Sequence, residues 1–226
     1  MCIIAYTDAG QKVRKSGHSQ WGSVLLLAHK DAMAGHTAAG TPIDFASSKV
    51  HLTCTASYDA ELHGCQSGLE GLECLQFGLA EICQAVDAAA FLRLEPHQRP
   101  LSGIAIDAKG LYTRIENAYR TEKKGGLYAR KLVEHLVRAG VVLYWVNSGH
   151  MLADAMTKTW ERSFGELLLA FVTEGKVRLT YCEESWKREL QKRRAGELRI
   201  IELPADTNAP EDASSTAHEF QTLAKL

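Results

Sequence analysis

The stretch Cys2-Ile-Ile-Ala-Tyr-Thr-Asp8 opens the chain with a short apolar run that ends in a carboxylate. A run of this kind predicts a buried β-strand. Ile104-Ala-Ile-Asp107 repeats the pattern near the middle of the chain. If the two strands run parallel, their aspartates lie at the same edge of a sheet, where open α/β sheets bind ligands.

Strand-like and helical segments alternate on either side of these two runs, which predicts an α/β fold. The first three strands are expected close together in sequence, as an antiparallel meander. A helix is expected from Ser57, because Leu62, Cys65, Leu69, Leu72, Leu75 and Leu79 share one helical face. The expected strands are 2–8, 21–29, 43–48, 104–107 and 141–146; the expected helices are 57–79, 81–94, 109–118, 128–137 and 151–157; 31–40 is expected as a loop and 120–126 as a basic turn.

The chain of 226 residues divides into three expected parts. Residues 1–160 form the α/β domain. Residues 161–202 form an appendage with an amphipathic helix, a strand over 176–181 and a charged helix over 183–194. Residues 203–226 are rich in Pro, Ala, Asp, Ser and Thr and have little to bury, which predicts disorder.

Composition excludes several classes of protein. Hydrophobic residues make up 46% and charged residues 23%, so collagenous, low-complexity and wholly disordered chains are excluded. Apolar runs are far shorter than the about 20 residues of a membrane helix, so no membrane partner is expected. The net charge is −1, but the last thirty positions carry six acidic and two basic residues, so the rest of the chain is mildly basic. A basic body permits a nucleic-acid partner without requiring one.

Six cysteines are present, with no CxxC pair and no histidine at zinc-finger spacing. This usage predicts reduced thiols and a cytoplasmic or nuclear location.

Four carboxylates stand at related places in the expected fold: Asp8 and Asp107 end strands, Glu61 lies in the first turns of the long helix, and Asp154 lies in the helix after the last strand. Singly, each is explained as a turn-forming, capping or helix-dipole residue. Together they predict one acidic cluster. Such a cluster is costly unless divalent cations neutralise it, and carboxylate oxygens with retained waters suit Mg²⁺.

Several short motifs resemble the ribonuclease H domain of copia-type retrotransposon polyproteins. Tyr6-Thr-Asp8-Ala resembles the family's first-strand SDA motif, and Thr55-Ala-Ser-Tyr-Asp-Ala-Glu61-Leu resembles LSSTEAEY. Ile106-Asp107 matches the fourth-strand acid. Trp145-Val146 with Met151-Leu-Ala-Asp154-Ala-Met-Thr-Lys158 resembles V.T..QLADxLTK, the most specific of these motifs. The resemblance covers roughly residues 1–160.

Two weaker motifs, Arg14-Lys-Ser16-Gly17 and Phe45-Ala-Ser-Ser-Lys49, are similar to the family's R.S.SG turn and third strand. The chain departs from the family at Ala108, where the family has Asn, and after Asp8, where the family's DW pair is missing.

The resemblance implies a ribonuclease H-like fold: a five-stranded mixed sheet, the first three strands antiparallel, with helices on both faces. It implies that Asp8, Glu61, Asp107 and Asp154 are catalytic and bind two Mg²⁺ ions, with Mn²⁺ as a substitute. One ion would lie between Asp8 and Asp154, and the other among Asp8, Glu61 and Asp107. The implied reaction is endonucleolytic hydrolysis of the RNA strand of an RNA–DNA hybrid, in a chain whose ancestral polyprotein carried a reverse transcriptase upstream.

Further residues are candidates for contact with the hybrid. Small polar groups at Thr7, Ser16, Ser57 and Tyr58 suit contacts with 2′-hydroxyls in the minor groove. The basic set Arg120, Lys123, Lys124, Arg130 and Lys131 suits phosphates of the DNA strand, although a solvated helix face is an equal alternative. His150 is a candidate for proton transfer, against the alternative of a surface or capping histidine.

Two other functions remain open from the sequence. One is a catalytically decayed remnant that binds nucleic acid without cleaving it. The other is an exonuclease of the same superfamily, which is disfavoured because the first strand carries a lone Asp8 rather than an Asp-x-Glu pair.

Overall fold

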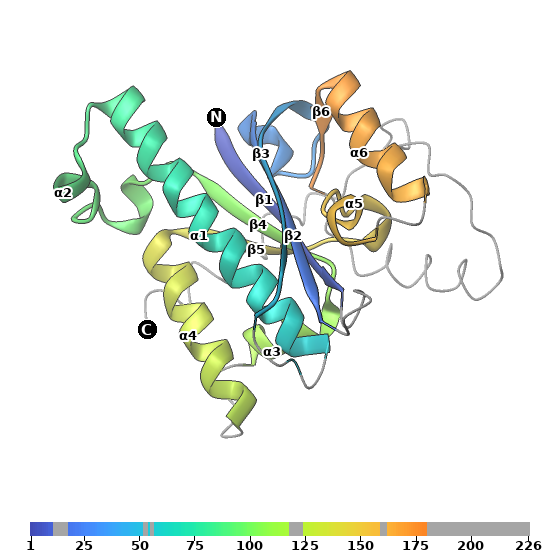
Figure 1. Ribbon diagram of the computed structural model, residues 1–226. Coiled ribbons are helices and arrows are strands. Elements are labelled where there is room, and N and C mark those ends of the chain that lie inside the picture. The colour runs from blue at the N-terminus through green and yellow to red at the C-terminus, as the bar shows by residue number, and fades with distance from the viewer. Residues whose placement is uncertain (11–17, 52–53, 55–56, 118–123, 159–161, 180–226) are drawn as a thin grey trace.

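A mixed six-stranded sheet forms the centre of the computed structural model, which describes residues 1–10, 18–51, 54, 57–117, 124–158 and 162–179 (Figure 1). Its strand order is β5-β4-β1-β2-β3-β6. The strands are β1 (Cys2–Gly10), β2 (Gln20–Ala28), β3 (Ala38–Lys49), β4 (Ser102–Ile106), β5 (Val141–Trp145) and β6 (Lys176–Val177).

The pairing is antiparallel from β1 to β2 and from β2 to β3, and parallel from β1 to β4 and from β4 to β5. The expected α/β class and the antiparallel opening are therefore confirmed. The expected number of five strands is wrong, because Lys176–Val177 pairs antiparallel with Ala38–Ala39 and adds a strand at the edge. This short strand is the described part of the strand expected over 176–181.

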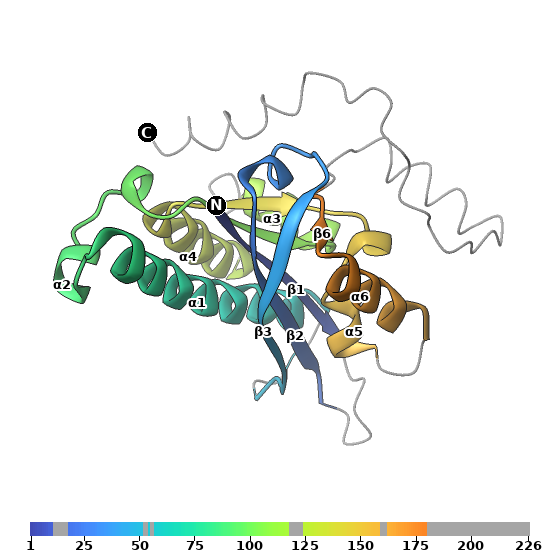
Figure 2. The same ribbon diagram turned by 90° about the horizontal axis from the view of Figure 1, so that it is seen from above.

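Helices cover both faces of the sheet, as expected (Figures 1 and 2). Those on one face pack on Ile3 and Ala5 of β1, and those on the other on Ile4 and Tyr6. Because both faces are buried, β1 is a continuous apolar run rather than an alternating one. The helices are α1 (Ser57–Gln84), α2 (Ala88–Phe91) and α3 (Lys109–Glu116), then α4 (Lys124–Ala139), α5 (Asp154–Thr157) and α6 (Arg162–Glu174); α1, α3 and α4 cover the first face, α5 and α6 the second.

Several expected boundaries are corrected. The helix α1 runs on to Gln84, because no glycine or proline interrupts residues 79–84, and only the four-residue α2 follows where a helix over 81–94 was expected. The expected loop 31–40 contains a single 3-10 turn, Lys30–Ala32, and the start of β3. The helix α4 begins at Lys124, inside the expected basic turn, and Tyr128, the first residue of the expected helix, is 61% exposed.

Two glycines let helices approach the carboxyl end of β1 from opposite sides. On one side, a Cβ at Gly68 of α1 would lie 2.1 Å from Cγ2 of Thr7. On the other, a Cβ at Gly22 of β2 would lie 2.4 Å from Cβ of Met156 in α5. A side chain at Gly68 would push α1 away from β1, the strand that carries Asp8. A side chain at Gly22 would push α5 away from β2, whose Gly22 pairs with Asp8.

A buried glutamine fixes α1 at its other end. The side-chain nitrogen of Gln76 donates to the Ser102 hydroxyl and to the carbonyl oxygens of Pro100 and Ala139, at 2.9–3.2 Å. These bonds tie α1 to the start of β4 and to the end of α4, on the same face of the sheet.

The part of the chain after α5 shares the core of the sheet. Phe171, Val177 and Leu179 pack with Ile4 and Tyr6 of β1. The expected charged helix over 183–194 and the expected disordered tail over 203–226 lie outside the described residues. Among the described helices, none has the length and apolar character needed to cross a bilayer. None of the five described cysteines forms a disulfide.

The close approach at Gly68 can be tested by substitution. In Gly68→Ala the new methyl group collides with Thr7, which is 2% exposed and has no space to move into. Gly78→Ala is the matched control, since nothing lies within 4 Å of its Cβ in the same helix and both changes gain the same helix propensity. We expect the free energy of unfolding, measured by urea denaturation, to be about 2–3 kcal/mol lower for Gly68→Ala than for Gly78→Ala. Equal stabilities would contradict this packing.

Candidate metal centre

The register of the two central parallel strands brings Asp8 and Asp107 to the same level. Tyr6 of β1 is paired with Ala105 of β4, so the residues two positions later, Asp8 and Asp107, are neighbours at the carboxyl end of the sheet. Side chains alternate along a strand, so Asp8 faces the same side as Tyr6, which is the side of α5 and α6. Asp8 is 2% exposed, and Asp107 is half-buried.

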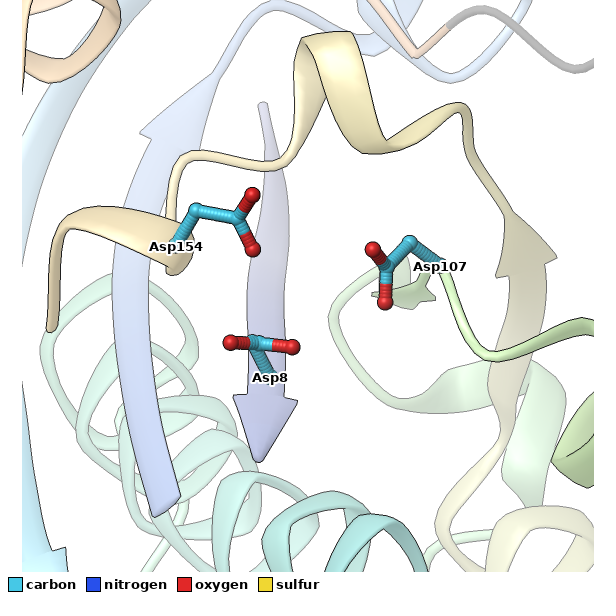
Figure 3. Close-up of side chains that lie close together, drawn as sticks. All are labelled: Asp8, Asp107 and Asp154. Atoms are coloured by element: carbon cyan, nitrogen blue, oxygen red, sulfur yellow. The ribbon is translucent and has the colours of Figure 1, made fainter. Parts of the chain in front are cut away.

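Asp154 completes the cluster from the first position of α5, where it is 1% exposed. Asp8, Asp107 and Asp154 each offer a carboxylate oxygen, and these three atoms lie within 4.8 Å of one another. Figure 3 shows the three carboxylates turned toward a common space. The structure therefore brings together three acids that are up to 146 positions apart in sequence.

Glu61 reaches the same region from the other face of the sheet. It lies in the first turns of α1, and a hydrogen bond joins its carboxyl group to the backbone of Ala9 in β1. Burial, followed by the negative charges of Asp8 and Asp107, raises its pKa well above the usual range. Glu61 is thus a neighbour of the aspartate triad, although it does not belong to the set whose oxygens lie within 4.8 Å.

Two residues next to Asp154 compensate the charge of the cluster. The hydroxyl of Thr157 donates a hydrogen bond to Oδ2 of Asp8. The ammonium of Lys158 lies 2.5 Å from Oδ1 of Asp154 and 3.6 Å from Oδ2 of Asp8. Burial acts to lower the pKa of Lys158, but the charges of Asp8 and Asp154 outweigh it and leave this pKa raised.

The compensation is incomplete. Burial and the charge of Asp8 raise the pKa of Asp154 to about 8, against the opposing effect of Lys158. Its second oxygen, Oδ2, is buried and has no hydrogen-bond partner among the described residues. A buried carboxylate oxygen without a partner is costly. Hard divalent cations bind such oxygens, so the donor set fits a metal such as Mg²⁺ or Mn²⁺.

The residues expected to contact a hybrid are only partly described. Ser57 is exposed at the start of α1, Lys131 is exposed on α4 and Arg130 is half-buried beside it; Lys124 begins α4. Ser16 and Lys123 lie outside the described residues. Thr7 was a candidate for contact with 2′-hydroxyls, but it is buried under α1 because Gly68 lies directly against it.

The side chain of Tyr58 is half-buried, and the guanidinium of Arg114 lies 4.2 Å from the centre of its ring. This contact joins the start of α1 to α3.

His150 lies in a small hollow between the sheet and α6, lined also by Tyr6, Phe171 and Arg178. Burial, with a smaller effect from the charge of Arg178, lowers its pKa. The lowered pKa of His150 therefore comes from its position in this hollow. Its role in proton transfer stays a prediction.

Sequence reasoning assigned no role to Thr157 and Lys158, although both stand in the motif quoted for Asp154. The available signal was their spacing: residues three and four positions after Asp154 lie on the same side of a helical turn as its side chain.

Comparison with models of known protein families and with curated protein sequences finds no match. Among solved structures the chain is similar to ribonuclease H domains. One is LC11-RNase H1 in complex with an RNA/DNA hybrid, at 16% identity and a TM-score of 0.45, over 70% of this chain and 94% of that one. The others are the N-terminal domain of a Mycobacterium tuberculosis protein (14%, 0.40, over 73% and 96%) and the enzyme of Halobacterium salinarum (16%, 0.40, over 70% and 96%).

The raised pKa values make the metal-free protein sensitive to pH. The pKa of Asp154 is 3.8 in the unfolded chain and about 8 in the folded one, so protonated Asp154 favours the folded state. This contribution is complete below pH 4 and is lost as pH rises through 8. We expect the Tm in EDTA to fall by at least about 5 °C more in the wild type than in Asp154→Asn between pH 5 and 8.5. An equal fall of Tm with pH in the two proteins would contradict the raised pKa of Asp154.

Proposed function

We propose that this chain is a magnesium-dependent phosphodiester hydrolase that cleaves the RNA strand of RNA–DNA hybrids, and that it derives from a copia-type retrotransposon. The single observation that carries the proposal is the convergence of Asp8, Asp107 and Asp154 on one space, with oxygens within 4.8 Å. Packing alone gives no reason to gather three acids there, because their charges repel one another.

The roles proposed for the chain's own residues follow from their positions. Asp8 of β1 lies near both Asp107, which follows β4, and Asp154, which begins α5. It would hold a metal together with either of them. Glu61 would add a ligand from the α1 side. Magnesium bound by these carboxylates supplies an activated water and offsets the charge on the leaving 3′ oxygen. Mn²⁺ is expected to substitute, because it takes the same oxygen ligands.

The substrate is proposed from the resemblance and from surface chemistry. The start of α1, with Ser57 exposed, lies beside Glu61 and suits contact with 2′-hydroxyls in the minor groove of a hybrid. Lys124, Arg130 and Lys131 of α4, with Ser16 and Lys123, are proposed to bind the strand phosphates. His150 is proposed to assist proton transfer. A cytoplasmic or nuclear location and an ancestral reverse transcriptase upstream belong to the same proposal.

One observation favours a second candidate, a decayed domain that binds hybrids without cleaving them. Lys158 is ion-paired with both Asp8 and Asp154, so the cluster carries a positive counter-charge of its own. A site that needed no metal for its stability could persist after catalysis was lost.

The two candidates are separated by cleavage of a labelled RNA–DNA hybrid, with duplex RNA as the comparison and with Mg²⁺ or EDTA. We expect cleavage of the hybrid only with Mg²⁺. In Asp107→Asn we expect the cleavage rate to fall more than about 100-fold while hybrid binding is retained, because mutation of residues that only hydrogen-bond to a metal ligand already lowers activity about 10–100-fold. Asp31→Asn is the control, because this acid is exposed and pairs with His29.

Undiminished cleavage by Asp107→Asn would refute the proposed site. Hybrid binding in EDTA, with no cleavage by the wild type at any Mg²⁺ concentration, would establish the second candidate.

A further inference from the structure

The ammonium of Lys158 stands between two of the three clustered aspartates. It lies 2.5 Å from Oδ1 of Asp154 and 3.6 Å from Oδ2 of Asp8. These are the two residues that the resemblance assigns to the first of two metal ions. A cation supplied by the chain therefore occupies the side of the cluster on which that ion is expected.

Local structure holds Lys158 in this place. Its backbone N–H donates to the carbonyl oxygen of Asp154 at 2.8 Å, so it continues the last turn of α5. The neighbouring Thr157 hydroxyl is bonded to the same Asp8 oxygen that faces the ammonium. Close contact of Met156 with Gly22 keeps this turn against the sheet. The Lys158 side chain is only 29% exposed.

The contacts of Lys158 divide the oxygens of the cluster. It pairs with Oδ1 of Asp154, whereas Oδ2 of the same carboxylate is buried and has no partner among the described residues. Asp8 likewise presents Oδ2 to Thr157 and Lys158, and Oδ1 is the other oxygen that it offers. The cluster thus has one side compensated by an ammonium and another with an uncompensated oxygen.

We propose that Lys158 takes the place of one divalent cation, so that the resting site binds a single ion within the aspartate triad instead of the two expected from the resemblance. The inference rests on the proposed function, because it takes the triad to be a metal site. A second ion between Asp8 and Asp154 would have to displace the ammonium or lie beside it. At about 4 Å in water, repulsion between a single and a double positive charge weakens binding about 30-fold.

The experiment counts bound Mn²⁺ by equilibrium dialysis and elemental analysis of the full chain without nucleic acid. We expect one ion per wild-type chain and a second that binds at least about 30-fold more weakly. We expect two ions of similar affinity in Lys158→Met, and one in Lys158→Arg, which keeps the charge. Lys30→Met, an exposed lysine in the turn before β3, is the matched control and is expected to bind one ion.

Thermal unfolding supplies a second readout. Loss of the ammonium leaves buried carboxylates uncompensated, so Lys158→Met should have a lower Tm than the wild type in EDTA and a larger rise on addition of Mn²⁺. If Lys158→Met does not fold without metal, the wild type and Lys158→Arg still test the stoichiometry.

Two tight ions in the wild type would overturn this inference and leave the proposed hydrolase intact. No bound ion in the wild type or in Lys158→Met would overturn the inference together with the proposed metal site.

Discussion

Mutual repulsion of carboxylates at the carboxyl end of β1 is the constraint around which this part of the protein is organised. Asp8 and Asp154 are almost fully buried and close to each other, so their negative charges cannot be screened by water. The protein reduces the repulsion in three ways: the Thr157 hydroxyl binds Asp8, Lys158 pairs with both acids, and Asp154 has a raised pKa. The remaining negative charge, above all at the buried Oδ2 of Asp154, is what a divalent cation would neutralise.

The sheet supplies the rigid frame on which these charges are held. β1 is paired on both sides, with β2 and β4, and is covered on both faces, so the position of Asp8 is fixed from four directions. The parallel register with β4 places Asp107 beside it, and α5 brings Asp154 in over Gly22. Residues distant in sequence therefore meet without any one of them lying on a long, unsupported loop.

Much of this arrangement was readable from the sequence. The two apolar runs that end in Asp8 and Asp107 indicated parallel strands with acids at one edge, and the structure brings these acids together with Asp154. Glu61 is a neighbour of these acids but stands outside the set, because it approaches from the opposite face of the sheet. A strand was expected over 176–181, but its pairing with Ala38–Ala39 as a sixth strand of the same sheet was not, since an alternating pattern does not identify the strand's partner.

Other features depend on tertiary contacts that local patterns do not encode. The burial of Thr7 follows from its contact with Gly68, and the polar Gln76 interrupts the predicted apolar face of α1 because three partners lie within its reach. The pairing of Lys158 with Asp8 and Asp154 was not predicted, because a lysine after a short helix is ordinarily a solvated residue.

The glycine pair around β1 has a consequence for how such a protein can change over generations. Gly68 lets α1 lie directly against Thr7 of β1, and Gly22 lets Met156 of α5 lie directly against β2. These close contacts hold the helices that carry Glu61 and Asp154 against the strands around Asp8. A lineage can therefore keep every acid and still lose the spacing between them, through a single added methyl group at a residue with no chemistry of its own.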